Sequence, residues 1–188
     1  MCEKILFMKK TVVAHDKSFE LFISEQEIQA RLLAIGNEIH EKYQDKRPLF
    51  IGVLNGAFIF AADLIRACGD LDCEIIFVKL SSYQGMASSG KVISVIGVEP
   101  NVVKDRDIII IEDIVDTGKT MNDFMATLKS YEPKSIALAT MFLKPDALEH
   151  EVKVDYVGFS IPNKFILGYG LDYDGLGRNL SEVYQLVV

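Results

Sequence analysis

DIIIIEDIVDTGKTM, residues 107–121, is the most informative run of this chain. Its four consecutive isoleucines, Ile108–Ile111, predict a strand that is buried on both faces. From Met121 onward, apolar residues recur at helical spacing as far as Leu128. A buried strand that leads through a short turn into an amphipathic helix is the repeating unit of a parallel sheet flanked by helices.

The same alternation recurs elsewhere in the chain. Ser24 and Glu27 have the spacing of a capping box, and the apolar pattern after them predicts a helix over residues 25–43. Further elements are a strand in PLFIGVL (48–54), a turn at Asn55-Gly56, a helix in FIFAADLIRA (58–67), and strands in EIIFVKL (74–80), SIALATMF (135–142) and VDYVGF (154–159). We therefore expect an α/β fold with a central, mostly parallel sheet.

A polar segment with glycines, SSYQGMASSG (81–90), interrupts this series. It follows one apolar strand closely and precedes another, KVISVIG (91–97). The segment is therefore predicted to be the flexible tip of a long hairpin that is poorly ordered without ligands, rather than a linker between domains. Because no internal repeat or domain boundary is found, residues 1–188 are expected to form a single domain.

Length, charge and cysteine content exclude several classes of protein. The chain has 188 residues, 49% of them hydrophobic, as is typical of a packed globular domain. A net charge of −7 repels nucleic acid and anionic lipid. Because the sequence has no apolar run long enough for a membrane span and no signal-peptide core, we expect a cytoplasmic protein that binds neither nucleic acid nor membrane. Cys2, Cys68 and Cys73 lack metal-site spacing, which predicts reduced thiols.

The GKT of residues 118–120 resembles the end of a Walker A loop, G-x-x-x-x-G-K-[ST]. The first glycine of that motif would fall at Asp113, where a carboxylate would repel the phosphates of a nucleoside triphosphate. The turn nevertheless lies between a buried strand and a helix, where free N–H groups and the helix dipole favour a phosphate. It suits one phosphate monoester, bound by main-chain groups and by the hydroxyls of Thr117 and Thr120.

An acidic pair, Glu112 and Asp113, precedes this turn. Carboxylates on one side and a phosphate site on the other suit a ribose 5-phosphate, whose hydroxyl groups the carboxylates would bind. Taken alone, the pair is equally consistent with a solvated strand end, and Asp116 with a helix N-cap. The whole string, however, places two acidic residues before a D-T-G-x-T loop at Asp116–Thr120, and it resembles the phosphoribosyl-diphosphate signature of the type I phosphoribosyltransferases.

The resemblance extends over nearly the whole chain and is closest to the hypoxanthine-guanine phosphoribosyltransferases. Leu54–Gly56 matches the pyrophosphate loop of that family, and Ser82-Tyr83 matches its catalytic flexible loop. Lys144 matches the lysine that recognises the purine, and Phe165–Arg178 (FILGYGLDYDGLGR) matches the base-stacking and hood segment.

This resemblance implies a type I phosphoribosyltransferase fold, with a small hood formed from the N-terminal segment and roughly residues 160–188. It also implies transfer of the 5-phosphoribosyl group from 5-phospho-α-D-ribosyl 1-diphosphate to N9 of hypoxanthine, guanine or both, giving IMP or GMP and diphosphate in purine salvage. Mg²⁺ is the implied cofactor, because phosphate and hydroxyl oxygens suit this ion. A homodimer or homotetramer is the implied assembly.

The resemblance assigns the sugar phosphate and the metal to the acidic residues and the turn. Glu112 and Asp113 bind the ribose hydroxyls or belong to the metal shell, and Asp172 contacts the metal. The residues that surround the phosphate are Thr117, Gly118, Lys119 and Thr120.

The purine is assigned to residues farther along the chain. By resemblance, Asp116 acts as general base or acid at N7. The Lys144 ammonium donates to O6 of hypoxanthine or guanine, a contact that the amino group of adenine does not accept. Phe165 stacks on the base, while Ile166 and Asp172 offer main-chain carbonyls to its lower edge.

The remaining segments act on the leaving group. Leu54-Asn55 corresponds to a peptide bond that is cis in some members of the family, and its N–H groups face the diphosphate. The family often has a basic residue where this chain has Asn55, and Arg178 is the residue that compensates for the missing charge. Ser82 and Tyr83 belong to a lid that excludes water from the reacting centre.

Two alternatives stay open on the sequence alone. One is a regulator or sensor that keeps a phosphoribosyl pocket without turnover, although such a protein should carry a basic face or a further domain that binds nucleic acid. The other is a phosphoribosyltransferase that prefers xanthine, because Lys144 argues against adenine but not against xanthine.

Overall fold

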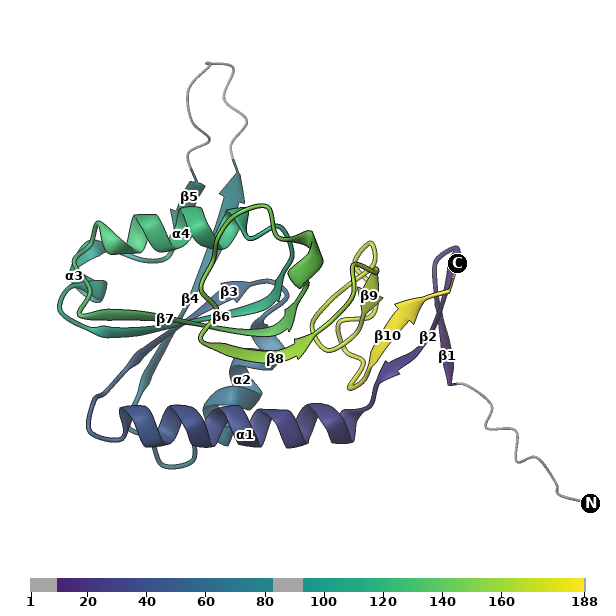
Figure 1. Cartoon of the computed structure of the whole chain (residues 1–188), viewed down its shortest axis with the longest axis horizontal. Coiled ribbons are helices and arrows are strands. Elements are labelled where there is room, and N and C mark those ends of the chain that lie inside the picture. The colour runs from purple at the N-terminus through teal and green to yellow at the C-terminus, as the bar shows by residue number, and fades with distance from the viewer. Residues whose placement is uncertain (1–9, 83–92, 188) are drawn as a thin grey trace, which may run out of the picture.

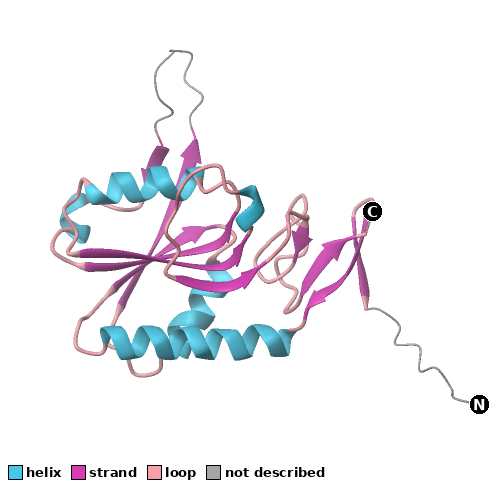
Figure 2. Ribbon diagram, in the orientation of Figure 1, coloured by secondary structure: helices cyan, strands magenta, loops and turns pink. Residues whose placement is uncertain are grey.

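This computed structural model describes residues 10–82 and 93–187, which form two sheets joined by helices and loops (Figures 1 and 2). The larger sheet has the strand order β5-β4-β3-β6-β7-β8, and the smaller has the order β1-β2-β10-β9. The larger sheet consists of β3 (Leu49–Leu54), β4 (Glu74–Ser82), β5 (Ile93–Ile96), β6 (Asp107–Val115), β7 (Ser135–Leu143) and β8 (Tyr156–Ser160). The smaller consists of β1 (Thr11–Ala14), β2 (Lys17–Ile23), β9 (Ile166–Leu167) and β10 (Val183–Leu186).

All neighbours in the larger sheet are parallel except β4 and β5, which form an antiparallel hairpin. The chain runs outward from β3 to β4 and β5, then returns to place β6 on the other side of β3. In open α/β sheets, ligands bind at the carboxyl ends of the strands where the order reverses in this way. The fold therefore predicts a ligand site at the carboxyl ends of β3 and β6.

Helices cover both faces of this sheet (Figure 1). The helical elements are α1 (Glu25–Tyr43), α2 (Phe58–Ala67), α3 (Pro100–Val103), α4 (Lys119–Lys129) and a 3₁₀ turn, η1 (Pro145–Ala147). Ile109 and Ile111 of β6 pack in the cluster with α1 and α2, whereas Ile108 and Ile110 pack in the cluster with α3 and α4. The isoleucine run is thus buried on both faces, as predicted.

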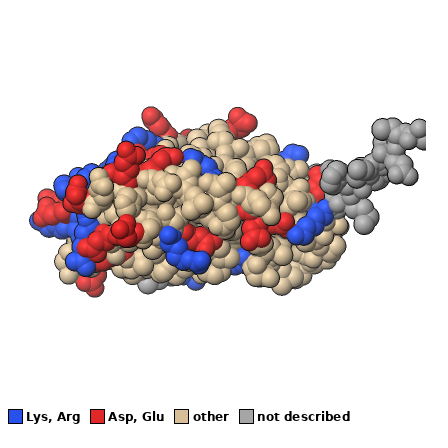
Figure 3. Space-filling view, turned by 90° about the horizontal axis from the view of Figure 1, so that it is seen from below, with Lys and Arg blue, Asp and Glu red and all other residues tan. Residues whose placement is uncertain are grey.

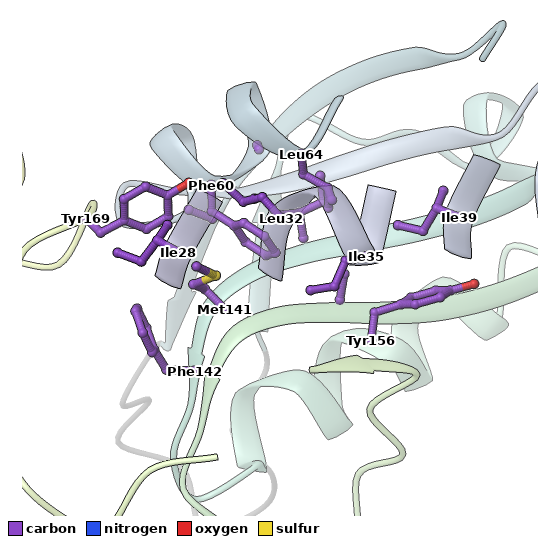
Figure 4. Packing of buried hydrophobic residues seen from close by; sticks show 14 of the residues in the cluster. Ile28, Leu32, Ile35, Ile39, Phe60, Leu64, Met141, Phe142, Tyr156 and Tyr169 are labelled. Atoms are coloured by element: carbon purple, nitrogen blue, oxygen red, sulfur yellow. The ribbon is translucent and has the colours of Figure 1, made fainter. Parts of the chain in front are cut away.

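Helix α1 spans the predicted range, because its capping box forms. The Ser24 hydroxyl accepts from the Glu27 N–H, and the Glu27 carboxylate accepts from the Ser24 N–H. Its buried stripe packs against α2, β7 and β8, with the residues Ile28, Leu32, Ile35 and Ile39 (Figure 4). Full burial of each such side chain stabilises the fold by about 1.5–3 kcal/mol.

The smaller sheet combines distant parts of the chain. Strand β2 pairs with β1 on one side and with β10 on the other, and β10 pairs in turn with β9. Phe19, Leu167 and Tyr184 form the centre of its own apolar cluster. These strands lie in the two segments for which the sequence predicts a hood.

The predicted fold class is confirmed, and the differences concern the ends of elements. Strand β8 begins two residues later than predicted, because Asp155 donates its N–H to the Leu138 carbonyl and its carboxylate accepts from the Leu138 N–H. The β4–β5 hairpin is present, but its predicted flexible tip lies outside the described residues. Cys68 and Cys73 are free thiols, as predicted.

None of the helices in the described part of the chain has the length and apolar character needed to cross a membrane.

Candidate active site

The carboxyl ends of three neighbouring strands bring most of the predicted site residues together. Leu54 ends β3 and Asn55-Gly56 follow it, Glu112 and Asp113 lie near the end of β6, and Lys144 immediately follows β7. Because β6 pairs with both β3 and β7, these groups lie side by side at one edge of the sheet. This edge is the one at which the strand order reverses.

The acidic pair is held in an environment that opposes its ionisation. Glu112 is partly exposed as a residue, yet its Oε2 is enclosed and has no hydrogen-bond partner among the described residues. Burial raises the pKa of Glu112 well above its usual value, and the neighbouring Asp113 raises it further. Burial also raises the pKa of Asp113, although the Ile114 N–H, 2.8 Å from Oδ1, favours the charged form. An unpaired enclosed oxygen is costly. Glu112 also lines the adjoining cavity, so the pair is suited to a ligand that brings hydroxyl groups there.

The predicted phosphate turn surrounds a small cavity beside this pair. Helix α4 begins at Lys119, and its N-cap Gly118 has φ 78°. A Cβ at Gly118 would lie 2.8 Å from the His150 carbonyl oxygen, so glycine fits here on two grounds. The cavity has a volume of about 100 Å³ and is lined by Glu112, Ile114, Val115, Asp116, Thr117, Gly118, Thr120 and Met121. N–H groups at a helix start and two threonine side chains suit a phosphate.

The structure does not bring the Lys119 ammonium to this cavity. Its Nζ lies 2.9 Å from Asp123 Oδ2, one turn along α4. Lys119 therefore offers its main chain rather than its charge to the turn. A larger hollow of about 320 Å³ lies between α4 and the start of β7, at the opposite edge of the sheet from the acidic pair.

The loop after β3 fits tightly against the acidic pair. The Leu54–Asn55 peptide bond is cis, in agreement with the sequence interpretation. A Cβ at Gly56 would lie only 1.4 Å from Asp113 Oδ2. Any other residue at position 56 would have to displace the carboxylate or the loop, so the backbone of this loop and Asp113 share one surface.

Lys144 and Asp116, which were predicted to contact two different atoms of a purine, are paired with each other. Lys144 is 8% exposed, and its Nζ lies 2.8 Å from Asp116 Oδ2. The Lys144 N–H donates to the Val115 carbonyl at 3.0 Å, which fixes the end of β7 against the end of β6. In a 6-oxopurine, O6 and N7 are neighbours on one edge of the base. A paired donor and carboxylate at this spacing match that edge.

The segment that contains Phe165 and Arg178 reaches the site at Gly170, which packs against Gly56. The Phe165 side chain is 46% exposed and lies edge-on to Tyr173, with ring centroids 5.7 Å apart. Ile166 is buried in β9. Asp172 Oδ1 lies 2.5 Å from Arg178 Nη2, so these two charges form an ion pair within the segment.

Sequence reasoning missed one contact that joins this segment to the loop after β3. A Cβ at Gly170 would lie 2.1 Å from the Gly56 carbonyl oxygen, and φ of Gly170 is 98°. The G-Y-G of residues 168–170 carries the signal, because glycines mark close approach of backbones. Ser82 is the last residue of β4, and Tyr83 lies outside the described residues.

Comparisons with known proteins agree with this geometry. The model of the phosphoribosyl transferase domain family matches residues 24–174. The hypoxanthine-guanine phosphoribosyltransferase of Bacillus subtilis is 41% identical over 164 residues, which cover 87% of this chain and 91% of that protein. The hypoxanthine phosphoribosyltransferase of Escherichia coli is 35% identical over 171 residues, which cover 90% of this chain and 96% of that protein.

A solved structure agrees as well. The crystal structure of a hypoxanthine phosphoribosyltransferase from Staphylococcus aureus superposes with a TM-score of 0.81 at 33% identity, covering 89% of this chain and 91% of that one. The family match, the relatives and the solved structure all point to the same family, in agreement with the acidic pair, the phosphate turn and the paired lysine at one edge of the sheet. The chain belongs to the phosphoribosyl transferase domain family.

Proposed function

We propose that this chain is a purine-salvage enzyme that transfers the 5-phosphoribosyl group from 5-phospho-α-D-ribosyl 1-diphosphate to N9 of hypoxanthine, guanine or both. The products are IMP or GMP and diphosphate. The observation that carries the proposal is the Lys144–Asp116 pair, 2.8 Å apart and beside the phosphate turn. Relatives named hypoxanthine or hypoxanthine-guanine phosphoribosyltransferase support it over nearly the full chain.

The sugar phosphate occupies the acidic pair and the turn. N–H groups of Thr117–Thr120 and the threonine hydroxyls bind the 5-phosphate. Glu112 and Asp113 accept hydrogen bonds from the ribose hydroxyls, and Glu112 lines the cavity beside the turn.

The base lies between the Lys144–Asp116 pair and Phe165. Lys144 donates to O6, while Asp116 exchanges a proton with N7 as the bond to N9 forms. Adenine carries an amino group in place of O6 and would place a donor, rather than an acceptor, opposite the buried Lys144 ammonium. The partly exposed Phe165 ring stacks on the purine, and main-chain carbonyls of Ile166 and Asp172 bind its lower edge.

Diphosphate leaves with inversion at C1′, and the backbone of Leu54–Gly56 together with Arg178 binds it. Among the described residues, no group of three or more His, Cys, Asp or Glu side chains is arranged to hold a metal. Asp172, 28% exposed at its side chain, suits a Mg²⁺ ion whose other ligands are substrate oxygens and water. When bound, Mg²⁺ neutralises charge on the leaving diphosphate. The alternative role of Glu112 and Asp113 is to hold the metal shell instead of the ribose hydroxyls.

We extend the proposal to the smaller sheet and to assembly. The smaller sheet, from the N-terminal segment and roughly residues 160–188, serves as a hood over the base within a single domain. Homodimers or homotetramers form through apolar side chains left exposed on α2 and β4, which are Phe58, Ile75 and Phe77 at 42%, 37% and 40%.

The test is a Mg²⁺-dependent assay of the purified protein with the sugar diphosphate and hypoxanthine, guanine, xanthine or adenine supplied separately. We expect IMP, GMP or both. Predominant turnover of xanthine would show that xanthine, rather than hypoxanthine or guanine, is the substrate. Binding of the sugar diphosphate without turnover of any base would indicate a sensor. Substitution Lys144→Ala should erode the preference for 6-oxopurines over adenine, and an unchanged profile would contradict its assignment.

Charge favours a small-molecule ligand over nucleic acid. The chain has a net charge of −7, and on the face shown in Figure 3 acidic and basic side chains are interspersed rather than gathered into a basic surface. A nucleic-acid-binding regulator would need such a surface to neutralise phosphates.

A further inference from the structure

A buried tyrosine joins the substrate segment to helix α2. Tyr169 is 3% exposed, and its hydroxyl donates to Asp63 Oδ2 at 2.8 Å. The ring packs in the same apolar cluster as Ile28 of α1 and Phe60 of α2 (Figure 4). Burial raises the pKa of the Tyr169 phenol, and the hydrogen bond to Asp63 raises it further, so the hydroxyl remains a donor. Oδ1 of Asp63 lies 3.6 Å from Arg66 Nη1, which leaves Oδ2 for the tyrosine.

The backbone at this position has a conformation that tyrosine rarely adopts. Gly168, Tyr169 and Gly170 have φ of 107°, 49° and 98°. A positive φ at a bulky residue persists only where the surroundings hold it. Here the Tyr169 N–H donates to the Leu180 carbonyl at 2.9 Å, and the side chain is fixed at its far end by Asp63.

The position of Tyr169 fixes the neighbouring residues of the segment, including the arginine that is proposed to bind the diphosphate. Gly170, the next residue, approaches the Gly56 carbonyl so closely that a Cβ would lie 2.1 Å from that oxygen. Its own carbonyl accepts from Arg178 Nη1 at 2.7 Å, and its N–H donates to the Arg178 carbonyl at 3.0 Å. Arg178 in turn pairs with Asp172. A continuous series of contacts therefore runs from Asp63 to the groups proposed to bind metal and leaving group.

We propose that Tyr169 and Asp63 are positioning residues, which hold Asp172 and Arg178 against the Leu54–Gly56 loop so that 5-phospho-α-D-ribosyl 1-diphosphate binds productively. The inference rests on the proposed function. Neither residue touches the substrate, because the Tyr169 hydroxyl points away from the site and into the contact with α2.

The test compares variants by steady-state kinetics, by calorimetry with the sugar diphosphate and Mg²⁺, and by thermal unfolding. Tyr169→Phe keeps the ring and removes the hydrogen bond. Loss of a hydrogen bond to a charged group should raise KM and Kd for the sugar diphosphate about tenfold. The value of kcat should change by less than about twofold, because no transition-state contact is removed. Asp63→Ala should have the same effect from the α2 side, and Asp63→Asn, which keeps an acceptor, should restore most of the affinity.

Tyr173→Phe is the matched control. The Tyr173 hydroxyl also donates to an aspartate, Asp16 Oδ1 at 3.0 Å, from the same segment but at the exposed surface. Its loss should leave KM and Kd unchanged. The double variant Tyr169→Phe/Asp63→Ala should bind no more weakly than either single variant, because both changes remove one interaction.

Several outcomes would overturn the positioning role. These are a wild-type Kd in folded Tyr169→Phe and Asp63→Ala proteins, additive losses in the double variant, or an equal effect of Tyr173→Phe. A wild-type protein that binds the sugar diphosphate but transfers nothing would defeat the proposed function alone, since the calorimetric comparison still decides the positioning role. A wild-type protein that does not bind the sugar diphosphate would defeat both.

Discussion

Strand β6 carries Asp107 at its start and the pair Glu112 and Asp113 toward its end, and the pKa of Asp107 is shifted in the opposite direction from the pKa values of the pair. At its start, burial disfavours the charge on Asp107, but hydrogen bonds from Ser135 Oγ at 2.5 Å and Lys134 Nζ at 3.2 Å outweigh burial and lower the pKa. Toward its end, burial raises the pKa of Glu112, and Oε2 finds no partner among the described residues.

The same contrast extends across the sheet. Near its amino edge, Glu74 lies within ion-pair distance of Arg47 and Arg106, at 3.3 Å and 3.0 Å. At the carboxyl edge, Glu112 and Asp113 form no ion pair among the described residues and lie against glycine backbone and a cavity, although Asp116 and Asp172 nearby pair with Lys144 and Arg178. The acidic groups at the amino edge are paired within the fold and contribute to its stability, whereas Glu112 and Asp113, which lack such partners in the described part of the chain, lower the stability.

The largest effect that this contrast predicts is at Asp116, just beyond β6. Asp116→Asn removes the proton acceptor at N7 and should lower kcat by about 10²-fold or more. The protein should stay folded, because the asparagine amide oxygen can still accept a hydrogen bond from the buried Lys144 ammonium. Purine turnover near the wild-type rate would contradict the assignment.

Substitution of a glycine by alanine should affect substrate binding at the carboxyl edge of the sheet and not at the amino edge. Gly56→Ala places a Cβ 1.4 Å from Asp113 Oδ2. We expect it to lower the free energy of unfolding by about 1–3 kcal/mol and to raise KM for the sugar diphosphate at least about tenfold. The control is Gly69→Ala in the turn after α2, where φ is 66° and no atom lies within 4 Å of the added Cβ. It should cost about 1–2 kcal/mol of stability and leave KM unchanged. Equal effects of the two changes on KM would contradict the claim that Gly56, and not Gly69, lies at the binding site of the sugar diphosphate.

Asp107→Asn should affect stability alone. Loss of its hydrogen bonds should lower the free energy of unfolding by about 1–2 kcal/mol at pH 7. The pKa of Asp107 lies below its model-peptide value of 3.8, so the ionised group stabilises the fold above that pH. This stabilisation is lost as pH falls through the folded-state pKa. Chemical denaturation at pH 7 and pH 3 should therefore show a smaller difference between wild type and variant at the lower pH, with kcat unchanged at pH 7.

Glu112→Gln should have the smallest effect on stability, and of the opposite sign. Because the pKa of Glu112 in the fold is raised above its ordinary value of 4.5, folding becomes less favourable as pH rises from 4.5 toward the folded-state pKa. Removing the ionisable group should stabilise the protein by about 1 kcal/mol at pH 8 and not at pH 4. KM for the sugar diphosphate should rise, because a hydroxyl acceptor is lost. A variant less stable than wild type at pH 8 would show that Glu112 supports the fold.

Elements governed by local patterns were predictable from the sequence. The capping box of Ser24 and Glu27 and the isoleucine run of β6 each act over a few residues, and both form as expected. The smaller sheet was located only by resemblance, because β9 has two residues and lies next to a run with several positive φ values. No local pattern could indicate that its strands would pair.

Contacts between distant residues were the part of the site that sequence reasoning could not supply. Asp116 and Lys144 were each identified, but not their mutual pairing across 28 positions. Asp63 lies 106 positions from Tyr169, in a helix whose own pattern explains it as a surface carboxylate. Such pairs follow from topology, which brings α2 and the substrate segment together only once the sheet has formed.

The strand order of the smaller sheet has a consequence for synthesis on the ribosome. Strand β10, near the end of the chain, lies between β2 and β9, with Val183 opposite Ile23. Strands β3 to β8 are all translated before β10, so the larger sheet can assemble while β2, which pairs with β1 on one side, still lacks β10 on the other. A frameshift or premature stop shortly before codon 183 would thus yield a nascent chain with an intact larger sheet and an unclosed smaller one.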